Sequence, residues 1–465
     1  MALGRRREQF QQELMVPTSA LPRSPGHPFY VALNKLLAEA KFDAYVEGLC
    51  ESLYREGGRP SIPPGVFFRM LFIGYFEGID SQRGIAWRCS DSLSLRSFLG
   101  LKPTESAPDH SSLTIIRQRL PKGLIEQVFA FVLQIAFEKK LLKGKSIGVD
   151  ATTLEANAAM KSIVRRDSGA TWKEYLTKLA KEAGIESPTD DQLRQFDRKR
   201  KGKKTSNDDW QSPSDPDARI TKMKDGTTGL AYKAEHAVDL DTDVVVAADV
   251  KPANDADGET VKETVVDAQA NLNEATKQDR CISEIVADKG YHKTETLVWL
   301  GERGIRTYVP ARRDKRKRRW DDKPEGWREA VYENARRVGR EKGKGLQRRR
   351  AEVVERSFAH LCATGGARRT WIRGLAEVGK RYLVSVMAHN LGVILRTLIG
   401  VGKPREWASM RALLASLRCV WSTIVAIVLD ALRQIVDLAE TVGRPLLGGR
   451  FSFVAAEKAA TSTGC

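Results

Sequence analysis

Ile285-Val-Ala-Asp-Lys-Gly-Tyr291 places an aspartate, Asp288, directly after a short apolar run. A second segment has the same design, because Ser146-Ile-Gly-Val-Asp150 also ends on an aspartate. Short apolar runs beside turn residues are typical of buried central strands. In open α/β sheets the ligand crevice lies beyond the strand ends. The sequence therefore predicts two strands that carry Asp150 and Asp288 towards one crevice.

A third acidic residue, Glu355, lies in a stretch with a different period. Val354, Phe358 and Leu361 recur at helical spacing, which predicts an amphipathic helix with Glu355 on its flank. One Asp at a strand end is most often a cap or an ion-pair partner, but three carboxylates in such settings can converge on metal. Oxygen ligands suit Mg²⁺ or Mn²⁺. Two such ions can activate a hydroxyl and stabilise the leaving oxygen of a phosphodiester.

The charge of the chain favours a polyanionic partner. Its 465 residues carry a formal net charge of +18 and are 42% hydrophobic, which allows two to four domains with a sizeable core. Residues 311–350 contain 17 Lys and Arg against 7 Asp and Glu, and a second basic cluster spans residues 198–204. A solvated loop would show the same charges. Neither cluster is an amphipathic helix with a broad apolar face, which argues against a membrane partner.

The cysteines and the N-terminus predict a cytoplasmic protein. Six cysteines are scattered without close pairing, so the sequence suggests neither a disulfide framework nor a zinc site. Arg5, Arg6 and Arg7 are followed by polar residues rather than an apolar run, unlike a secretory signal. The apolar stretch near Val420 to Leu429 is too short to span a bilayer.

After a flexible N-terminus (residues 1–27), residues 28–122 are predicted to form an all-helical domain. Ser111 or Ser112 is the expected N-cap of a helix that ends before Pro121. Several short helices with basic side chains are typical of a helix-turn-helix DNA-binding module, although a helical dimerisation domain would have the same pattern. The basic residues that this reading assigns to DNA are Arg88, Arg117 and Arg119.

Residues 123–400 are predicted to form an α/β catalytic domain with an RNase H-like core. A helix over residues 123–139 leads into the Asp150 strand. The elements that follow are a hairpin over residues 231–250, a helix over 259–273, the Asp288 strand, a helix over 294–303 with Gly304 as its cap, a strand over 305–309 and the Glu355 helix. Two insertions are expected, a polar one at about 158–216 with a helical part and a mobile loop, and a basic one at about 311–345.

Residues 401–465 are predicted to be a helical C-terminal extension. Trp407 to Ala439 is apolar at helical intervals and indicates one or two helices, suited to oligomerisation. The small, polar segment from Ala455 to Cys465 indicates a disordered end.

Seven ordered motifs resemble those of the DDE transposases of bacterial insertion sequences, in the broad group that includes the IS-four and IS-five types. The resemblance covers roughly residues 25–400. The motifs are Gly-Arg-Pro-Ser-Ile-Pro-Pro (58–64), Gly-Ile-Asp-Ser-Gln-Arg-Gly-Ile-Ala-Trp (78–87), Pro-Asp-His-Ser-Ser-Leu (108–113), Gly-Val-Asp-Ala-Thr (148–152), Asp-Pro-Asp-Ala-Arg (215–219), Ala-Asp-Lys-Gly-Tyr (287–291) and Val-Glu-Arg-Ser-Phe (354–358).

The resemblance implies that Asp150, Asp288 and Glu355 are catalytic ligands of two Mg²⁺ or Mn²⁺ ions. It further implies cleavage and strand transfer of double-stranded DNA, with the element's terminal inverted repeats and target DNA as partners, by a homodimer associated with the bacterial nucleoid. An RNase H-like nuclease without strand transfer, and a DNA-binding protein derived from a transposase, are the alternatives.

One position departs from the family pattern. Many relatives have Lys seven residues after the glutamate, where this chain has Cys362. Arg348, Arg349 and Arg356 are therefore the candidates for contacts with the DNA end.

Further polar and aromatic residues near these motifs are predicted to be structural. His236 and His292 are assigned to the core, Asp215 and Asp217 to turns or caps, Tyr291 and Trp371 to buried positions, and Lys289 to a strand on which it points away from the metal.

Overall fold

The computed structural model describes residues 26–443, except for residues 55, 56, 58–60, 103, 200–205, 224 and 313–318. The predicted flexible N-terminus, apart from its last two residues, and the predicted disordered end lie outside the described residues. Contacts divide the chain into two units, Met1–Pro404 and Arg405–Cys465, and each is described by itself.

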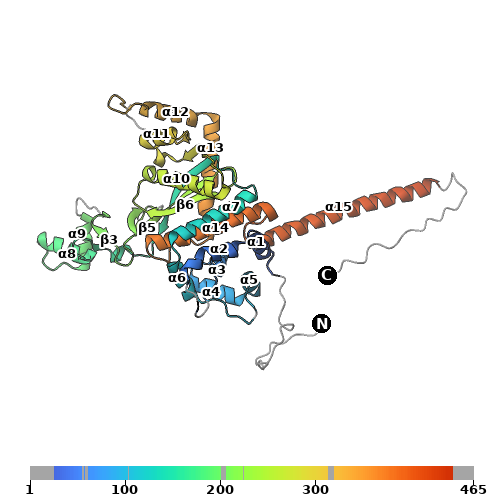
Figure 1. The fold of residues 1–465 in the computed structure, drawn as a ribbon, viewed down its shortest axis with the longest axis horizontal. Coiled ribbons are helices and arrows are strands. Elements are labelled where there is room, and N and C mark those ends of the chain that lie inside the picture. Colours follow the sequence, from blue (N-terminus) through green and yellow to red (C-terminus); the bar gives the residue numbers. More distant parts are fainter. Residues whose placement is uncertain are drawn as a thin grey trace, which may run out of the picture. The chain divides into compact units, whose positions relative to one another are not determined.

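The N-terminal part of the first unit is helical, as predicted (Figure 1). Helix α3 is its centre, because apolar residues on all sides of this helix are buried. The elements are α1 (Pro28–Glu39), α2 (Phe42–Cys50), η2 (Glu51–Leu53), α3 (Pro64–Glu77), α4 (Gln82–Asp91), α5 (Leu93–Phe98), α6 (His110–Arg119) and α7 (Lys122–Glu138).

The predicted N-cap of α6 is wrong by two residues. Asp109 caps this helix, and its carboxylate accepts a hydrogen bond of 2.8 Å from the backbone N–H of Ser111. A carboxylate accepts a stronger hydrogen bond than a serine hydroxyl and also suits the positive end of the helix dipole. The helix ends at Arg119, ahead of Pro121, as predicted.

The core is a mixed six-stranded sheet flanked by helices. Its order is β4-β5-β1-β7-β8, with β6 also paired to β5. Strand β1 pairs antiparallel with β5 and parallel with β7, and β7 pairs parallel with β8. The strands are β1 (Ser146–Glu155), β4 (Arg219–Lys222), β5 (Thr228–Asp239), β6 (Val245–Pro252), β7 (Glu284–Ala287) and β8 (Arg306–Tyr308).

Strand β1 is longer than predicted, so Asp150 does not lie at the end of its strand. The parallel ladder between β1 and β7 ends at Val149, but β1 continues to Glu155 because β5 pairs with it along that whole length. The β-branched residues Thr152 and Thr153 favour this extension. Asp150 therefore lies at the point where β1 loses its β7 neighbour, and Asp288 follows β7 directly, as predicted.

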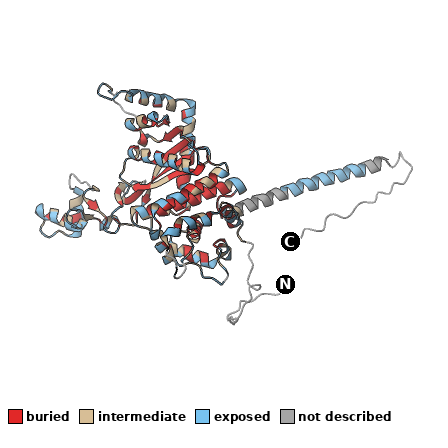
Figure 2. Ribbon diagram, viewed as in Figure 1, coloured by how far each residue is buried: buried red, intermediate tan, exposed pale blue. Residues whose placement is uncertain are grey.

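Helices pack on the sheet, and most strand residues are buried (Figure 2). Helix α13 lies against the face of β1 that includes Gly148, since a side chain there would approach Val354 within 2.9 Å. Helix α14 is long and apolar enough to cross a membrane, but 78% of its apolar window is buried, as in the core helix of a globular domain. The elements are α10 (Asp257–Thr276), η4 (Lys289–Tyr291), α11 (Thr294–Glu302), α12 (Trp327–Gly339), α13 (Glu341–Phe358), the π-helical turn η5 (Ala359–Thr364) and α14 (Leu375–Ile399).

The polar insertion contains the predicted helical part, and the predicted loop includes residues 200–205, which lie outside the described residues. Buried Leu176, Ala180 and Leu193 form a small core of their own, and Trp172 and Trp210 lie against each other with ring centroids 5.2 Å apart. The elements are η3 (Met160–Ser162), β2 (Val164–Arg165), α8 (Trp172–Glu182), α9 (Asp190–Lys199) and β3 (Trp210–Gln211).

The second unit contains one long helix, α15 (Glu406–Gly443), where one or two were predicted. Glu406 and Trp407 at its start are partly buried, and all the side chains from Val420 to Leu438 are exposed. The apolar ones cover a broad face of the helix, opposite a stripe that includes Asp430, Arg433 and Asp437.

Candidate active site

Asp150 and Glu355 line the same cleft. Its volume is about 620 Å³, and its walls come from β1, from α13 with the following π-helical turn, and from the turn between β4 and β5. Glu355 is exposed on the flank of α13, whereas the neighbouring Val354 is buried against the sheet. The regular helix ends at Phe358, so Leu361 falls in the π-helical turn rather than in the predicted helix.

Both oxygens of the Asp150 carboxylate are engaged. Oδ1 accepts a hydrogen bond of 2.8 Å from the backbone N–H of Ala151, and Oδ2 accepts one of 2.7 Å from Nη1 of Arg350. Burial raises the pKa of Asp150, and the nearby charge of Asp288 raises it further, while Arg350 opposes both effects. Arg350 is therefore the cation that opposes the effect of burial on this half-buried carboxylate.

Asp288 lines a recess of about 520 Å³, together with Lys289, Gly290, Ala311 and Arg312. The prediction that Lys289 lies on a strand is wrong, because β7 ends at Ala287 and the chain turns into η4. Lys289 thus stands beside Asp288 rather than on the opposite face of a strand. Tyr291, at the end of this turn, is buried in the core as predicted.

The three carboxylates do not form a ready-made cage. Within the described ranges, no group of three or more His, Cys, Asp or Glu side chains is arranged to hold a metal ion. The donor chemistry nevertheless fits Mg²⁺ or Mn²⁺: Asp150 and Glu355 face one cleft, and Asp288 is close enough for its charge to act on Asp150. Mg²⁺ is typically bound through one or two carboxylates, with water and substrate phosphate completing its shell.

His236 connects the two helices behind the cleft. It is fully buried on β5 beside Asp150, and its ring nitrogens lie 2.9 Å from Oγ of Ser357 and 2.8 Å from the hydroxyl of Tyr382. The imidazole also stacks on Phe358, with centroids 4.0 Å apart. Burial lowers the pKa of His236 to about 3, so the ring is neutral and structural, as predicted.

The end of β1 is tied to the segment that follows the π-helical turn. Glu155 donates its backbone N–H to the carbonyl of Arg368 and accepts a hydrogen bond from the N–H of Thr370, at 2.9 and 2.8 Å. This pairing brings exposed Arg368 to the cleft of Asp150 and Glu355. Cys362 is buried and lines the same cleft.

Five of the six arginines predicted to bind DNA make contacts within the chain. Arg88 lies 3.5 Å from Glu77, Arg117 donates to Glu377 at 2.7 Å, Arg119 stacks on Tyr54, Arg349 donates to the carbonyl of Leu240 at 2.8 Å, and Arg356 pairs with Asp243 at 2.8 Å. Arg117 in particular holds α6 to α14, with only 11% of its side chain exposed. Arg348 is exposed on α13.

Sequence reasoning missed Arg350, which the fold brings to Asp150, and Arg368, which it brings to the cleft. It named Arg83 among the basic residues of the predicted DNA-binding helices but assigned no role to Trp87, which shares an exposed face of α4 with Arg83 at helical spacing and is 68% exposed. An (i, i+4) Arg–Trp pair within a short amphipathic helix was a usable signal for Trp87. No local signal separates Arg350 from Arg348 and Arg349 except the apolar spacing of α13.

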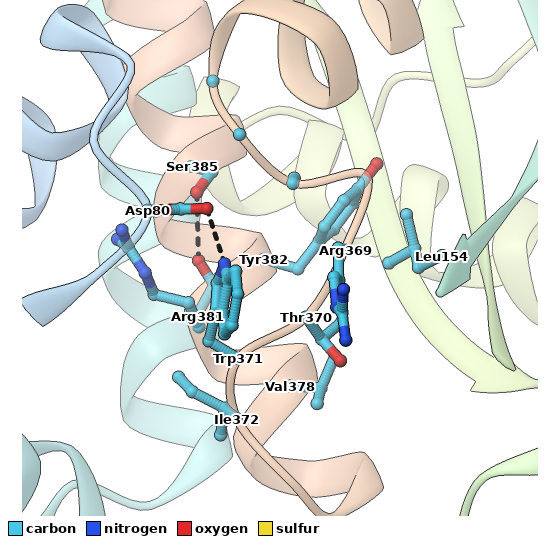
Figure 3. Close-up of a pocket in the computed structure, with 13 residues that line it drawn as sticks. Asp80, Leu154, Arg369, Thr370, Trp371, Ile372, Val378, Arg381, Tyr382 and Ser385 are labelled. Atoms are coloured by element: carbon cyan, nitrogen blue, oxygen red, sulfur yellow. Dashed lines mark hydrogen bonds between the residues drawn. The ribbon is translucent and has the colours of Figure 1, made fainter. Parts of the chain in front are cut away.

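A second pocket lies where the helical part meets the core (Figure 3). Trp371 faces Asp80 across it and donates its indole N–H to that carboxylate. The predicted burial of Trp371 is wrong, since 52% of this residue is exposed.

The predicted turn and cap roles hold for Asp215 and Asp217, which accept hydrogen bonds from the backbone N–H groups of Gly374 and Leu375.

Two families match the chain. Residues 19–119 match the transposase domain family DUF772, and residues 209–391 match the transposase DDE domain family. The two matches together cover more than half of the chain, and the second includes Asp288 and Glu355, whereas Asp150 lies between the two. No curated protein and no solved structure matches the chain significantly.

The mixed α/β core with its acidic cleft is that of a metal-dependent enzyme acting on DNA. The chain belongs to the DDE transposases of insertion sequences.

Proposed function

We propose that Asp150, Asp288 and Glu355 are the catalytic metal ligands, on an RNase H-like core. The observation that carries this proposal is the shared cleft of Asp150 and Glu355, with Asp288 beside it. The strand order β6-β5-β1-β7-β8, with β5 antiparallel and β7 parallel to β1, supports the RNase H-like assignment. The donors favour Mg²⁺ or Mn²⁺, in a two-ion arrangement.

The proposed reaction has two steps on DNA. Water attacks the phosphorus at the end of the element, the bond from phosphorus to the 3′ oxygen breaks, and a 3′ hydroxyl is released. That hydroxyl then attacks a phosphorus of the target strand and displaces the target's 3′ oxygen. The bound metal supplies activation of the attacking oxygen and charge stabilisation of the leaving one.

The residues of the chain hold and orient the DNA around this chemistry. Arg368 at the cleft and Arg312 at the Asp288 recess are exposed cations on either side of the carboxylates and suit backbone phosphates. The terminal inverted repeats are bound by the helical N-terminal part. There the exposed Arg83–Trp87 face of α4 supports a DNA contact better than Arg117, which is engaged with Glu377.

The full chain, incubated with Mg²⁺, a labelled duplex that ends in the element's inverted repeat, and a plasmid target, is expected to give both a cleaved end and a label joined to the plasmid. Strand transfer is expected because the same centre that frees the 3′ hydroxyl can align it with a second phosphodiester. Denaturing gels read both products. Cleavage without joined product indicates a nuclease, and end binding without either product indicates a DNA-binding protein; each result contradicts the proposal.

We further propose that the active complex is a homodimer and that α15 contributes to its assembly. The exposed apolar side chains of α15 over residues 420–438 are more than a soluble monomer ordinarily leaves uncovered. A chain that ends at Pro404, the boundary of the first unit, is expected to remain folded but to lose self-association. Light scattering after size-exclusion chromatography gives the mass of both proteins.

The control for this comparison keeps α15 in the chain and replaces two apolar side chains on its exposed surface. Ile427→Lys with Ile435→Lys places charges on that apolar face and is expected to weaken self-association as the truncation does. Equal masses for all three proteins, at concentrations where the full chain is oligomeric, would exclude α15 from the interface.

A further inference from the structure

Arg350 is a buried arginine of α13 whose guanidinium pairs with the carboxylate of Asp150 on β1. Only 9% of its side chain is exposed, and Nη1 donates to Oδ2 of Asp150 at 2.7 Å, across 200 residues of sequence. The stem of the side chain packs over Gly148, where a Cβ would lie 3.2 Å from Cγ of Arg350. The Nε–H is buried and has no acceptor among the residues that the structure describes.

This arrangement costs free energy that stem packing alone does not explain. A buried donor without an acceptor is unfavourable, and an apolar side chain of similar length would cover Gly148 without that cost. The charge of Arg350 is matched to Asp150, because the Asp150 side chain is only 25% exposed and lies where the β1–β7 ladder ends, next to the strand that Asp288 follows. Without a cation, these two negative charges repel each other in a medium of low dielectric constant.

A divalent ion held by Asp150 and a guanidinium on Oδ2 of the same carboxylate carry charges of the same sign. Their interaction is repulsive, and both draw on the same pair of oxygens, one of which already accepts from the N–H of Ala151. We propose that Arg350 is the resident counter-cation of the metal-free centre, which holds the carboxylate of Asp150 in place and competes with the divalent ion for it. Arg350 is thus a positioning residue that sets the metal affinity of the site.

This inference rests on the proposed function, because it takes Asp150 to be a metal ligand. It makes two predictions that would not follow if Arg350 had a purely structural role. Removing the charge of Arg350 tightens divalent-ion binding, and the destabilisation that follows its removal is relieved by also neutralising Asp150.

The first test is metal binding in the absence of DNA. The full chain, its Arg350→Met variant and its Arg350→Lys variant are titrated with Mn²⁺ by calorimetry. The Met variant keeps the stem over Gly148 and is expected to bind Mn²⁺ about tenfold more tightly, while the Lys variant keeps the charge and stays near the wild-type affinity. Arg348→Met removes the same charge from the exposed face of α13 and measures the general effect of lowering the net charge.

The second test is a cycle of unfolding measurements without metal. Arg350→Met and Asp150→Asn each leave one uncompensated buried partner, so each is expected to lower the folding equilibrium constant by about tenfold or more. The double variant removes both charges and is expected to recover most of that loss. Additive losses in the double variant would show that the pair has no coupling and would overturn the inference.

The failures of the two proposals can be distinguished. If the wild-type chain binds Mn²⁺ no better than Asp150→Ala, the proposed metal site is wrong and this inference falls with it. If the wild-type chain binds Mn²⁺ through Asp150 but Arg350→Met binds it equally or more weakly, only the inference about Arg350 is overturned. If the Met variant does not fold, the Lys variant is the test. Competition between the side chain at position 350 and the ion predicts near wild-type Mn²⁺ affinity for Arg350→Lys, so clearly weaker Mn²⁺ binding by this variant would overturn the inference.

Discussion

Asp150→Ala, Asp288→Ala and Glu355→Ala are each expected to reduce cleavage of the element end by about 10³-fold or more, because each removes a ligand from a centre that works by charge stabilisation. Binding of the end is expected to change little, since the proposed DNA contacts of the N-terminal part lie elsewhere on the chain. Cleavage of a labelled duplex measures the first effect, and gel mobility without metal measures the second.

Glu352→Ala is the matched control for this series. Glu352 lies on the same helix as Glu355, one turn earlier, with 59% of its side chain exposed. Its removal leaves the cleft unchanged and is expected to preserve cleavage. Normal cleavage by the Asp288 variant would contradict the three-ligand assignment, since Asp288 is the proposed ligand that follows β7.

His236→Ala is expected to have the largest effect on stability, a loss of about 3 kcal/mol or more in the free energy of unfolding. The change removes a fully buried ring that stacks on Phe358 and leaves the hydroxyl of Tyr382 without its acceptor. The end of α13 loses its anchor to β5, so the cleavage rate falls as well. Urea unfolding gives the stability.

Tyr382→Phe separates the two parts of this effect. It removes one hydrogen bond to His236 and leaves the ring in place, so a loss of about 1 kcal/mol is expected. If His236→Ala and Tyr382→Phe were equally mild, the packing of the imidazole between α13 and the sheet would contribute little, and the role assigned to His236 would be wrong.

The strands that precede Asp150 and Asp288 were predictable because their signals are local. The apolar runs before Asp150 and Asp288, the hairpin signal before Val245, and the glycine after α11 each mark an element within a few residues. The order of these elements then predicted an α/β core. The length of β1 was not predictable in this way. Its last residues are part of the strand because they pair with β5, which lies about 80 residues further along the chain.

The residues missed at the candidate site are those whose role depends on a distant neighbour. Arg350 is one of three consecutive arginines, and only the packing of α13 over Gly148 decides which of them is buried. Arg368 reaches the cleft because its segment pairs with Glu155 on a strand more than 200 residues earlier. The apolar spacing of α13 indicates only which face of the helix is buried, and composition contains no information about the distant partners.

Hydrogen bonds to β1 fix two of the three acidic residues, Asp150 and Glu355, relative to each other. Helix α13 is bound to the same strand twice, by Arg350 on Asp150 and by the segment after the π-helical turn on Glu155. Asp150 and Glu355 therefore move as one body, closed into a ring of hydrogen bonds and covalent chain. Asp288 is not part of this ring; it follows β7 directly, and its turn packs against α10. The spacing between Asp150 and Glu355 is thus set by two separate links to β1.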